Sequence, residues 1–140
     1  MDTLTFHAKL EDVPRVSAHV AVRADQELTA LHDVVRGAFG WDDDHLYSFW
    51  LDGRYWGDRD SEYTRPEGLD DLGDPVRTAA VAIGSLGLAI GQRIAYVFDF
   101  GDEWRVRLTV KAIDAADDDE YPRVLKRLGE APPQYPDPED

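Results

Sequence analysis

The sequence predicts an α+β fold in which a mixed or antiparallel sheet, built on long hairpins, packs against one main helix and short C-terminal helices. Three observations predict it: two runs of alternating apolar residues near the amino terminus, a helical stripe directly after them, and a long alternating hairpin in the second half. A chain of 140 residues is a usual size for one domain. We expect a single domain over residues 1–130 and a Pro-rich acidic tail over residues 131–140.

The first two strands are indicated by apolar residues at every second position. Successive side chains of a strand point to opposite faces, so this period predicts two half-buried strands joined by a short turn at Val13-Pro14. The alternating residues are Leu4, Phe6, Ala8, Leu10, Val16, Ala18, Val20 and Val22.

The main helix is indicated by a change of period after Asp25, which we take as its N-cap. The apolar residues then recur three or four positions apart, which places them on one helical face. Gly40 ends the stripe, as glycine often does at a helix terminus. The stripe consists of Leu28, Leu31, His32, Val35, Ala38 and Phe39.

The middle of the chain has shorter signals. A strand is expected over residues 45–51, and the Asp52-Gly53 turn favours a hairpin onto residues 54–56. Residues 57–76 contain many Asp, Gly and Pro residues and are expected to form a long surface loop. Two further short elements are expected: a strand over residues 79–83 and a helix over residues 85–90 that ends at Gly91.

The longest alternating segment covers residues 93–113 and predicts a hairpin at the centre of the sheet. Its turn lies at residues 100–102. After an acidic run, Pro122 is well placed to begin a short helix that continues to Leu128 and stops at Gly129. The apolar positions of the hairpin are Ile94, Tyr96, Phe98, Trp104, Val106, Leu108 and Val110.

The composition argues against several classes of function. The chain has no cysteine, so disulfides, thiolate metal sites and cysteine nucleophiles are excluded. The formal net charge of −14, from 29 acidic and 15 basic residues, disfavours binding to duplex DNA and to anionic membranes. The sequence has no basic, apolar leader and no long apolar run, so we expect a cytoplasmic protein.

A set of His and Asp residues is the first candidate site: His32 on the helical stripe, His45 at the start of a strand, and Asp99 and Asp102 around the hairpin turn. If these side chains converge, they could act as a general acid-base pair or hold a metal through His and carboxylate groups. The alternative is structural: a buried His32 bonded to one carboxylate, and Asp102 closing the turn. We assign no metal site and expect no cofactor.

A second candidate lies on the last long strand, where basic residues face away from the apolar set. Arg105, Arg107, Thr109 and Lys111 could line a groove for an anionic partner, or could form an ordinary polar outer face paired with acids. Trp104 is one of many aromatic residues in this chain, and some of them could line an exposed binding patch. The full candidate binding set is His32, His45, Asp99, Asp102, Trp104, Arg105 and Arg107.

Three stretches occur in an order that is specific in combination: Leu31-His32 leading to Gly40-Trp41, then His45-Leu46-Tyr47-Ser48-Phe49, then residues 96–104 with Asp99-Phe100-Gly101-Asp102-Glu103-Trp104. Together they resemble the plasmid pRiA4b ORF-3-like family over nearly the whole chain. The family includes passenger proteins of insertion sequences labelled TnpR-like. The resemblance implies an α+β fold and an association with plasmids and mobile elements, without an established activity.

We interpret the chain as a non-catalytic binding or accessory domain whose partner is an unknown protein or small ligand rather than duplex DNA or a membrane. Two alternatives remain. One is a hydrolase-like enzyme that uses the His and Asp set; the other is an acidic mimic of nucleic acid, which the net charge permits.

Overall fold

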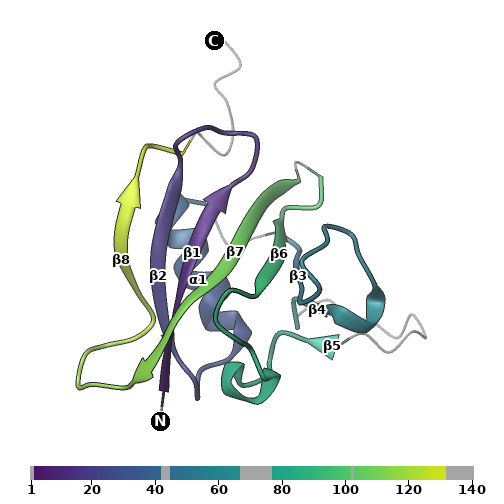
Figure 1. Cartoon of the computed structure of the whole chain (residues 1–140). Coiled ribbons are helices and arrows are strands. Elements are labelled where there is room, and N and C mark those ends of the chain that lie inside the picture. The colour runs from purple at the N-terminus through teal and green to yellow at the C-terminus, as the bar shows by residue number, and fades with distance from the viewer. Residues whose placement is uncertain (1, 42–44, 67–76, 102, 132–140) are drawn as a thin grey trace.

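The residues that the structure describes form a single eight-stranded sheet and one α-helix (Figure 1). The computed structural model describes residues 2–41, 45–66, 77–101 and 103–131. Strand order is β5-β4-β3-β6-β7-β1-β2-β8, and all neighbours are antiparallel except β4 and β5. The α+β prediction with a mixed sheet is therefore confirmed. The strands are β1 Asp2–Leu10, β2 Ser17–Arg23, β3 Tyr47–Trp50, β4 Glu62–Thr64, β5 Arg77–Thr78, β6 Arg93–Phe98, β7 Trp104–Ala115 and β8 Arg123–Leu128.

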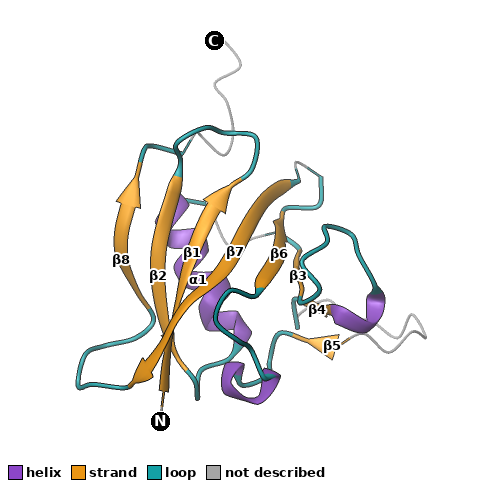
Figure 2. Ribbon diagram, in the orientation of Figure 1, coloured by secondary structure: helices purple, strands orange, loops and turns teal. Residues whose placement is uncertain are grey.

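The helix α1, Leu28–Phe39, covers one face of the sheet, which we call the helix face. Figure 2 shows α1 behind β1, β2 and β7, so the viewer looks at the opposite face, which we call the back face. The main core lies between α1 and the helix face and contains the alternating apolar residues of β1, β2, β6 and β7. Burying these side chains stabilises the fold because apolar surface leaves water.

Strands β1 and β2 form the hairpin that their alternation predicts. Phe6 lies opposite Val20 and both are fully buried, whereas His7 lies opposite His19 on the back face and both remain partly exposed. A shift of one residue would move every side chain to the other face, so burial of the apolar set fixes this register.

The hairpin of β6 and β7 is confirmed, and these strands occupy the two middle positions of the sheet. Val106 and Leu108 are fully buried, and Trp104 is partly buried against the core. Arg105 lies on the back face, as the period of two requires.

The helix ends at Gly40 as predicted, with φ of 75° in the left-handed region that glycine tolerates. Its start differs from the prediction. Asp25 pairs with Arg23 at 3.1 Å and does not cap the helix. The N-cap residue is Glu27, which makes no side-chain cap bond. Backbone oxygens of Ala79 and Val81 accept the first helical N–H groups instead, at 3.2 and 3.1 Å.

The hairpin expected over residues 45–56 is wrong. Strand β3 pairs with β4 and β6, and the chain turns at residues 51–53 without returning as a strand beside β3. The segment after the turn packs instead on a separate apolar cluster on the back face, where burial of apolar surface stabilises it. The cluster contains Trp50, Ala95 and Val97, with Tyr55 and Phe100 packed against them.

The region expected to be one long loop holds short elements. A 3₁₀ helix, η1, covers Arg59–Ser61 and leads into β4, while residues 67–76 lie outside the described residues. The strand expected over residues 79–83 is replaced by the two-residue β5 just before it. The helix expected over residues 85–90 is instead a 3₁₀ helix, η2, over Ile83–Leu86.

The C-terminal helix expected from Pro122 to Leu128 is wrong, because this segment forms β8 and pairs with β2. Its sequence suits either element, and the otherwise unpaired edge of β2 offers backbone partners that decide in favour of a strand. Gly129, expected to stop a helix, has φ of 74° and turns the chain after β8. The expected tail lies mostly outside the described residues.

Candidate functional site

The predicted candidate residues separate into two groups. His32, His45, Asp99 and Trp104 surround the aromatic side chain of Phe98 and its neighbours, whereas Arg105 and Arg107 lie on the back face. Asp102 lies outside the described residues. The structure therefore does not gather the six described members of the set into one site.

His32 is part of the core. Only 2% of its surface is exposed, its Nδ1 lies 2.6 Å from the hydroxyl oxygen of Tyr96, and its ring stacks on Tyr47 at a centroid distance of 3.6 Å. The buried imidazole thus has a polar partner, but the close partner is the hydroxyl of Tyr96 and not the carboxylate that the sequence suggested; the carboxylate of Asp33 lies 4.0 Å from Nε2. A buried polar group bonded in this way stabilises the packing of α1 on the sheet.

His45 and Asp99 form a separate pair at the rim of the core. His45 Nδ1 lies 3.5 Å from Asp99 Oδ2, and the side chains are 24% and 12% exposed. Asp99 has φ of 61° and also accepts a bond from the backbone N–H of Gly101 at 3.1 Å. The carboxylate therefore shapes the hairpin turn while it orients the imidazole.

Trp104 packs against Trp41 with ring centroids 5.5 Å apart, and Trp41 in turn stacks on Phe98. The Nε1 atoms of Trp41 and Trp104 are buried and have no hydrogen-bond partner in the part of the chain that the structure describes. Both rings act mainly through apolar contact.

Arg105 and Arg107 are engaged within the chain. Their guanidinium carbons lie 5.3 and 4.8 Å from the centroid of the Tyr55 ring. Arg105 also pairs with Glu103, and Arg107 donates to the backbone oxygen of Gly53. Burial raises the pKa of Tyr55 well above its ordinary range, although the Arg107 guanidinium acts in the opposite direction. These two arginines therefore hold the segment after β3 onto the back face.

A row of four residues crosses the remaining back face in direct register. Thr109 of β7 lies opposite His7 of β1, His7 opposite His19 of β2, and His19 opposite Lys126 of β8. The rings of His7 and His19 meet edge to face at 5.1 Å. Adjacent strands are about 4.8 Å apart, so the row spans roughly 14 Å. We call these four residues the cross-strand row.

Two lysines flank the cross-strand row. Lys9 and Lys111 lie close enough to His7 to act on its charge: burial lowers the pKa of His7, and the positive charges of His19, Lys111 and Lys9 lower it further. Lys9 donates to the backbone oxygens of Leu10 and Val13, at 2.7 and 2.8 Å. The surface around the row is therefore locally positive in an acidic protein.

The sequence indicated part of this surface. The alternation of their strand predicts that Lys111 and Thr109 face outward, whereas no pattern singled out His7 or His19. Their adjacency depends on the pairing of four strands, and Lys126 was assigned to a helix, so only the sheet register brings the row together.

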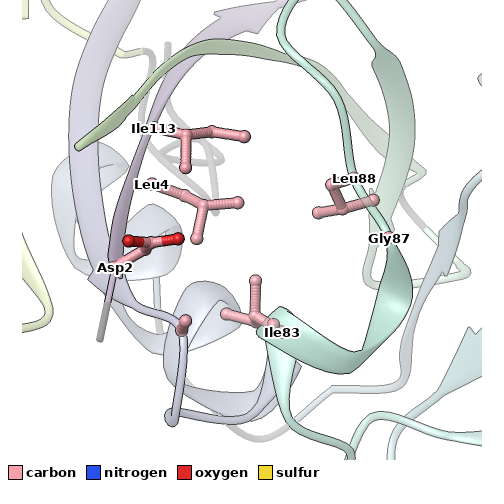
Figure 3. A pocket seen from close by; sticks show the side chains of 8 residues that line it. Asp2, Leu4, Ile83, Gly87, Leu88 and Ile113 are labelled. Atoms are coloured by element: carbon pink, nitrogen blue, oxygen red, sulfur yellow. The ribbon is translucent and has the colours of Figure 1, made fainter. Parts of the chain in front are cut away.

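Figure 3 shows a pocket between β1, the end of β7 and the segment around η2. Leu4, Ile83, Leu88 and Ile113 point into it, beside the Asp2 carboxylate. Its volume is about 160 Å³, below the roughly 300–1,000 Å³ of small-molecule sites. Leu4 and Ile83 are almost completely buried, so we regard it as a gap in packing.

Metal-ligand clusters and membrane-spanning helices are both absent from the residues that the structure describes. Within residues 2–41, 45–66, 77–101 and 103–131, no three His, Asp or Glu side chains are grouped so that they could hold a metal ion. No helix in these ranges is both long and apolar enough to cross a membrane.

Comparison with known proteins gives three findings. The family model described as "Plasmid pRiA4b ORF-3-like protein" matches residues 2–135. The uncharacterized protein y4hQ of Sinorhizobium fredii (strain NBRC 101917 / NGR234) is 30% identical over 123 residues, which cover 86% of this chain and 59% of that protein. The crystal structure of MM3350 from Methanosarcina mazei Go1, a protein of unknown function, has a TM-score of 0.77 at 21% identity, covering 95% of this chain and 72% of that one. This last similarity concerns the fold alone.

Proposed function

This chain belongs to the plasmid pRiA4b ORF-3-like family, and from that premise we propose that it is a non-catalytic binding domain that takes an anionic partner on the back face of its sheet. The binding surface is the cross-strand row with Lys9 and Lys111. An accessory role in plasmids or mobile elements, which the family description suggests, is part of the same proposal.

One observation carries the proposal. Lys111 and Lys126 are exposed and make no ion pair with any described residue, although the chain has 29 acidic residues against 15 basic ones. With acids in such excess, nearby carboxylates could neutralise these lysines, as Glu103 and Asp119 do for two arginines. Positive groups left without a partner around a row of two imidazoles suit an anionic group from outside the chain.

The net charge of −14 limits the size of that partner. Charges are screened over about 8–10 Å at physiological salt. A short anionic group bound at the cross-strand row therefore interacts mainly with the nearby lysines and histidines. A long polyanion such as duplex DNA would also meet the acidic remainder of the surface. The proposal is therefore a compact or short acidic partner.

Catalysis has less support, because the His and Asp set is divided between the core and the rim. His32 is buried and bonded to Tyr96, which leaves a substrate no access to its ring. The hydrolase-like alternative then depends on the 3.5 Å pair of His45 and Asp99. A His45→Ala variant that abolished a measured hydrolytic activity of the purified chain would favour this alternative.

The test of the binding proposal uses a fluorescently labelled hexaglutamate peptide at about 0.15 M salt, where charges are screened over about 8 Å. We expect it to bind the wild-type chain and to bind the Lys111→Glu, Lys126→Glu double variant about tenfold or more weakly, since reversing two exposed charges removes roughly 1–2 kcal/mol of attraction. Added salt should weaken wild-type binding because it screens these charges.

The control is Arg77→Glu, which reverses an exposed charge at the opposite edge of the sheet. Arg77 belongs to β5, which lies four positions from β7 and seven from β8 in the strand order, or roughly 19 and 34 Å away. Its effect on affinity should stay within about twofold because both distances exceed two screening lengths at this salt concentration. Equal losses in the control and the double variant would mean that only net charge matters, and the proposal would be wrong.

A further inference from the structure

We infer that the anionic partner is an extended acidic polypeptide segment, which binds by adding a ninth strand along the outer edge of β8. This inference rests on the binding function proposed above, and it specifies the chemical class of the partner and the way in which it is held.

The outer edge of β8 is open for such pairing. Strand β8 is the last of the sheet, and among the described residues its backbone pairs only with β2, on the inner side. Its six residues present an edge about 20 Å long. At the opposite edge of the sheet, β5 has only two residues and offers little to pair with. Backbone groups along an open edge are a template for an added strand.

The side chains of β8 determine which strand would fit. Lys126 and Arg127 make no ion pair with a described residue, while Arg123 pairs with Asp119 at 3.2 Å. Leu125 and Leu128 are each 45% exposed, so the strand also offers apolar surface. A segment that mixes carboxylates with apolar side chains would complement both features through cross-strand pairs.

A second copy of the chain is a poor occupant of this edge. Pairing of β8 with itself would bring the positive charges of Arg123, Lys126 and Arg127 close to their own copies, and like charges on facing strands destabilise a pair. Basic residues on an edge strand commonly prevent self-association in this way. The same charges attract an acidic strand, so the edge discriminates between the two occupants.

The cross-strand row gives the added strand a definite position. Lys126 lies opposite His19, so a carboxylate placed opposite Lys126 on its free side would extend the row by one more residue. The end of β8 is held in place at Gly129, where an added Cβ would lie 2.3 Å from the backbone oxygen of Arg15. This close approach fixes the end of the strand against the β1–β2 turn, while the register of the β2–β8 pair shifts by one residue between His19 and Val20.

The test uses an acetylated, amidated peptide of about seven residues that alternates Glu and Val, matched to the length of β8. Two derivatives carry N-methyl groups on the backbone nitrogens, one at all Glu positions and the other at all Val positions. In an edge pair only alternate N–H groups face the neighbouring strand. We therefore expect one derivative to bind about tenfold or more weakly than the parent and the other to bind within about threefold of it, since each lost backbone bond costs about 0.5–1.5 kcal/mol and about 1.4 kcal/mol corresponds to a tenfold loss of affinity.

Hydrogen exchange of the full chain provides the second measurement. Backbone amides of β8 should gain protection from exchange when the parent peptide binds. The Lys126→Gln variant should bind the parent peptide more weakly, while the thermal midpoint of the free protein should not change. If both derivatives bind like the parent and β8 gains no protection, strand addition is refuted while the binding proposal stands. If neither the parent peptide nor hexaglutamate binds, both are refuted. Dimerisation of the free chain through β8 in sedimentation would also overturn the inference.

Discussion

The Nδ1 atom of His32 lies 2.6 Å from the hydroxyl oxygen of Tyr96, and this contact joins the middle of α1 to strand β6 inside the core. The ring of His32 also stacks on the ring of Tyr47 of β3, and the two ring planes are inclined by 7°. The imidazole therefore connects the helix to two strands at once, which is a structural role.

From this contact we predict that His32→Ala lowers the free energy of unfolding by about 2–4 kcal/mol, the range for truncating a large buried side chain. Tyr96→Phe removes only the hydroxyl and should cost about 1–3 kcal/mol, because a buried ring nitrogen loses this partner. Urea denaturation measures both values. Hexaglutamate affinity should be unchanged in each variant at a temperature where it is folded. A loss of affinity with unchanged stability would show instead that His32 serves the binding site.

The partial exposure of Trp104 predicts a graded response to substitution. Trp104→Ala should cost about 3 kcal/mol, at the low end for large aromatic deletions, because the ring packs on Trp41 but is not fully buried. Trp104→Phe should cost less than about 1.5 kcal/mol, since Nε1 has no acceptor among the described residues and no hydrogen bond is lost. Chemical denaturation compares the two variants, and equal costs would contradict this view of the contact.

The lowered pKa of His7 predicts a pH dependence of stability. Burial, His19, Lys111 and Lys9 all disfavour the protonated form in the folded chain. The unfolded chain therefore binds more protons between the lowered pKa and about 6.5, so the free energy of unfolding falls as the pH drops through this window. Denaturation of wild type and His7→Asn at several pH values isolates this contribution, which should be absent in the variant.

The titration of His7 also predicts a pH dependence of anion binding. Lower pH should strengthen the binding, although it lowers the stability of the free chain. A bound carboxylate stabilises the protonated imidazole and raises the pKa of His7, so binding should take up protons and tighten as the pH falls below about 6.5. Titrations with hexaglutamate at several pH values measure the trend, and the His7→Asn chain serves as the control. If the affinity does not change with pH in either chain, His7 is not part of the binding surface.

Two glycines with similar backbone angles predict a steric contrast. Gly53 and Gly40 have φ of 79° and 75°, so either substitution by Ala should cost about 1–2 kcal/mol for the left-handed conformation. At Gly53 the added Cβ would also lie 2.9 Å from the backbone oxygen of Arg93, whereas at Gly40 it meets nothing within 4 Å. Gly53→Ala should therefore be the more destabilising change in thermal melts. The reverse order would mean that the segment after β3 is not held against β6.

Part of the candidate surface could be anticipated from the sequence, but its assembly could not. The period of two marked Thr109 and Lys111 as outward-facing; Thr109 is part of the cross-strand row and Lys111 flanks it. Lys126 was expected on a helix, and nothing in the local pattern states that His7 faces His19. The registers of three strand pairs create the row, and such registers depend on burial across the whole sheet.

The sequence by itself determined the elements whose periodicity is long: the hairpins β1–β2 and β6–β7, the helix α1 and its end at Gly40. In these segments one face must be apolar, so local spacing is enough to specify both the element and its orientation. Only the tertiary structure decided the elements whose local preference is balanced. Residues 123–128 became a strand because β2 offered an open edge, and α1 begins where the backbone oxygens of Ala79 and Val81 meet its first N–H groups. In both places the deciding hydrogen-bond partner lies far away along the chain, where no local pattern can report it.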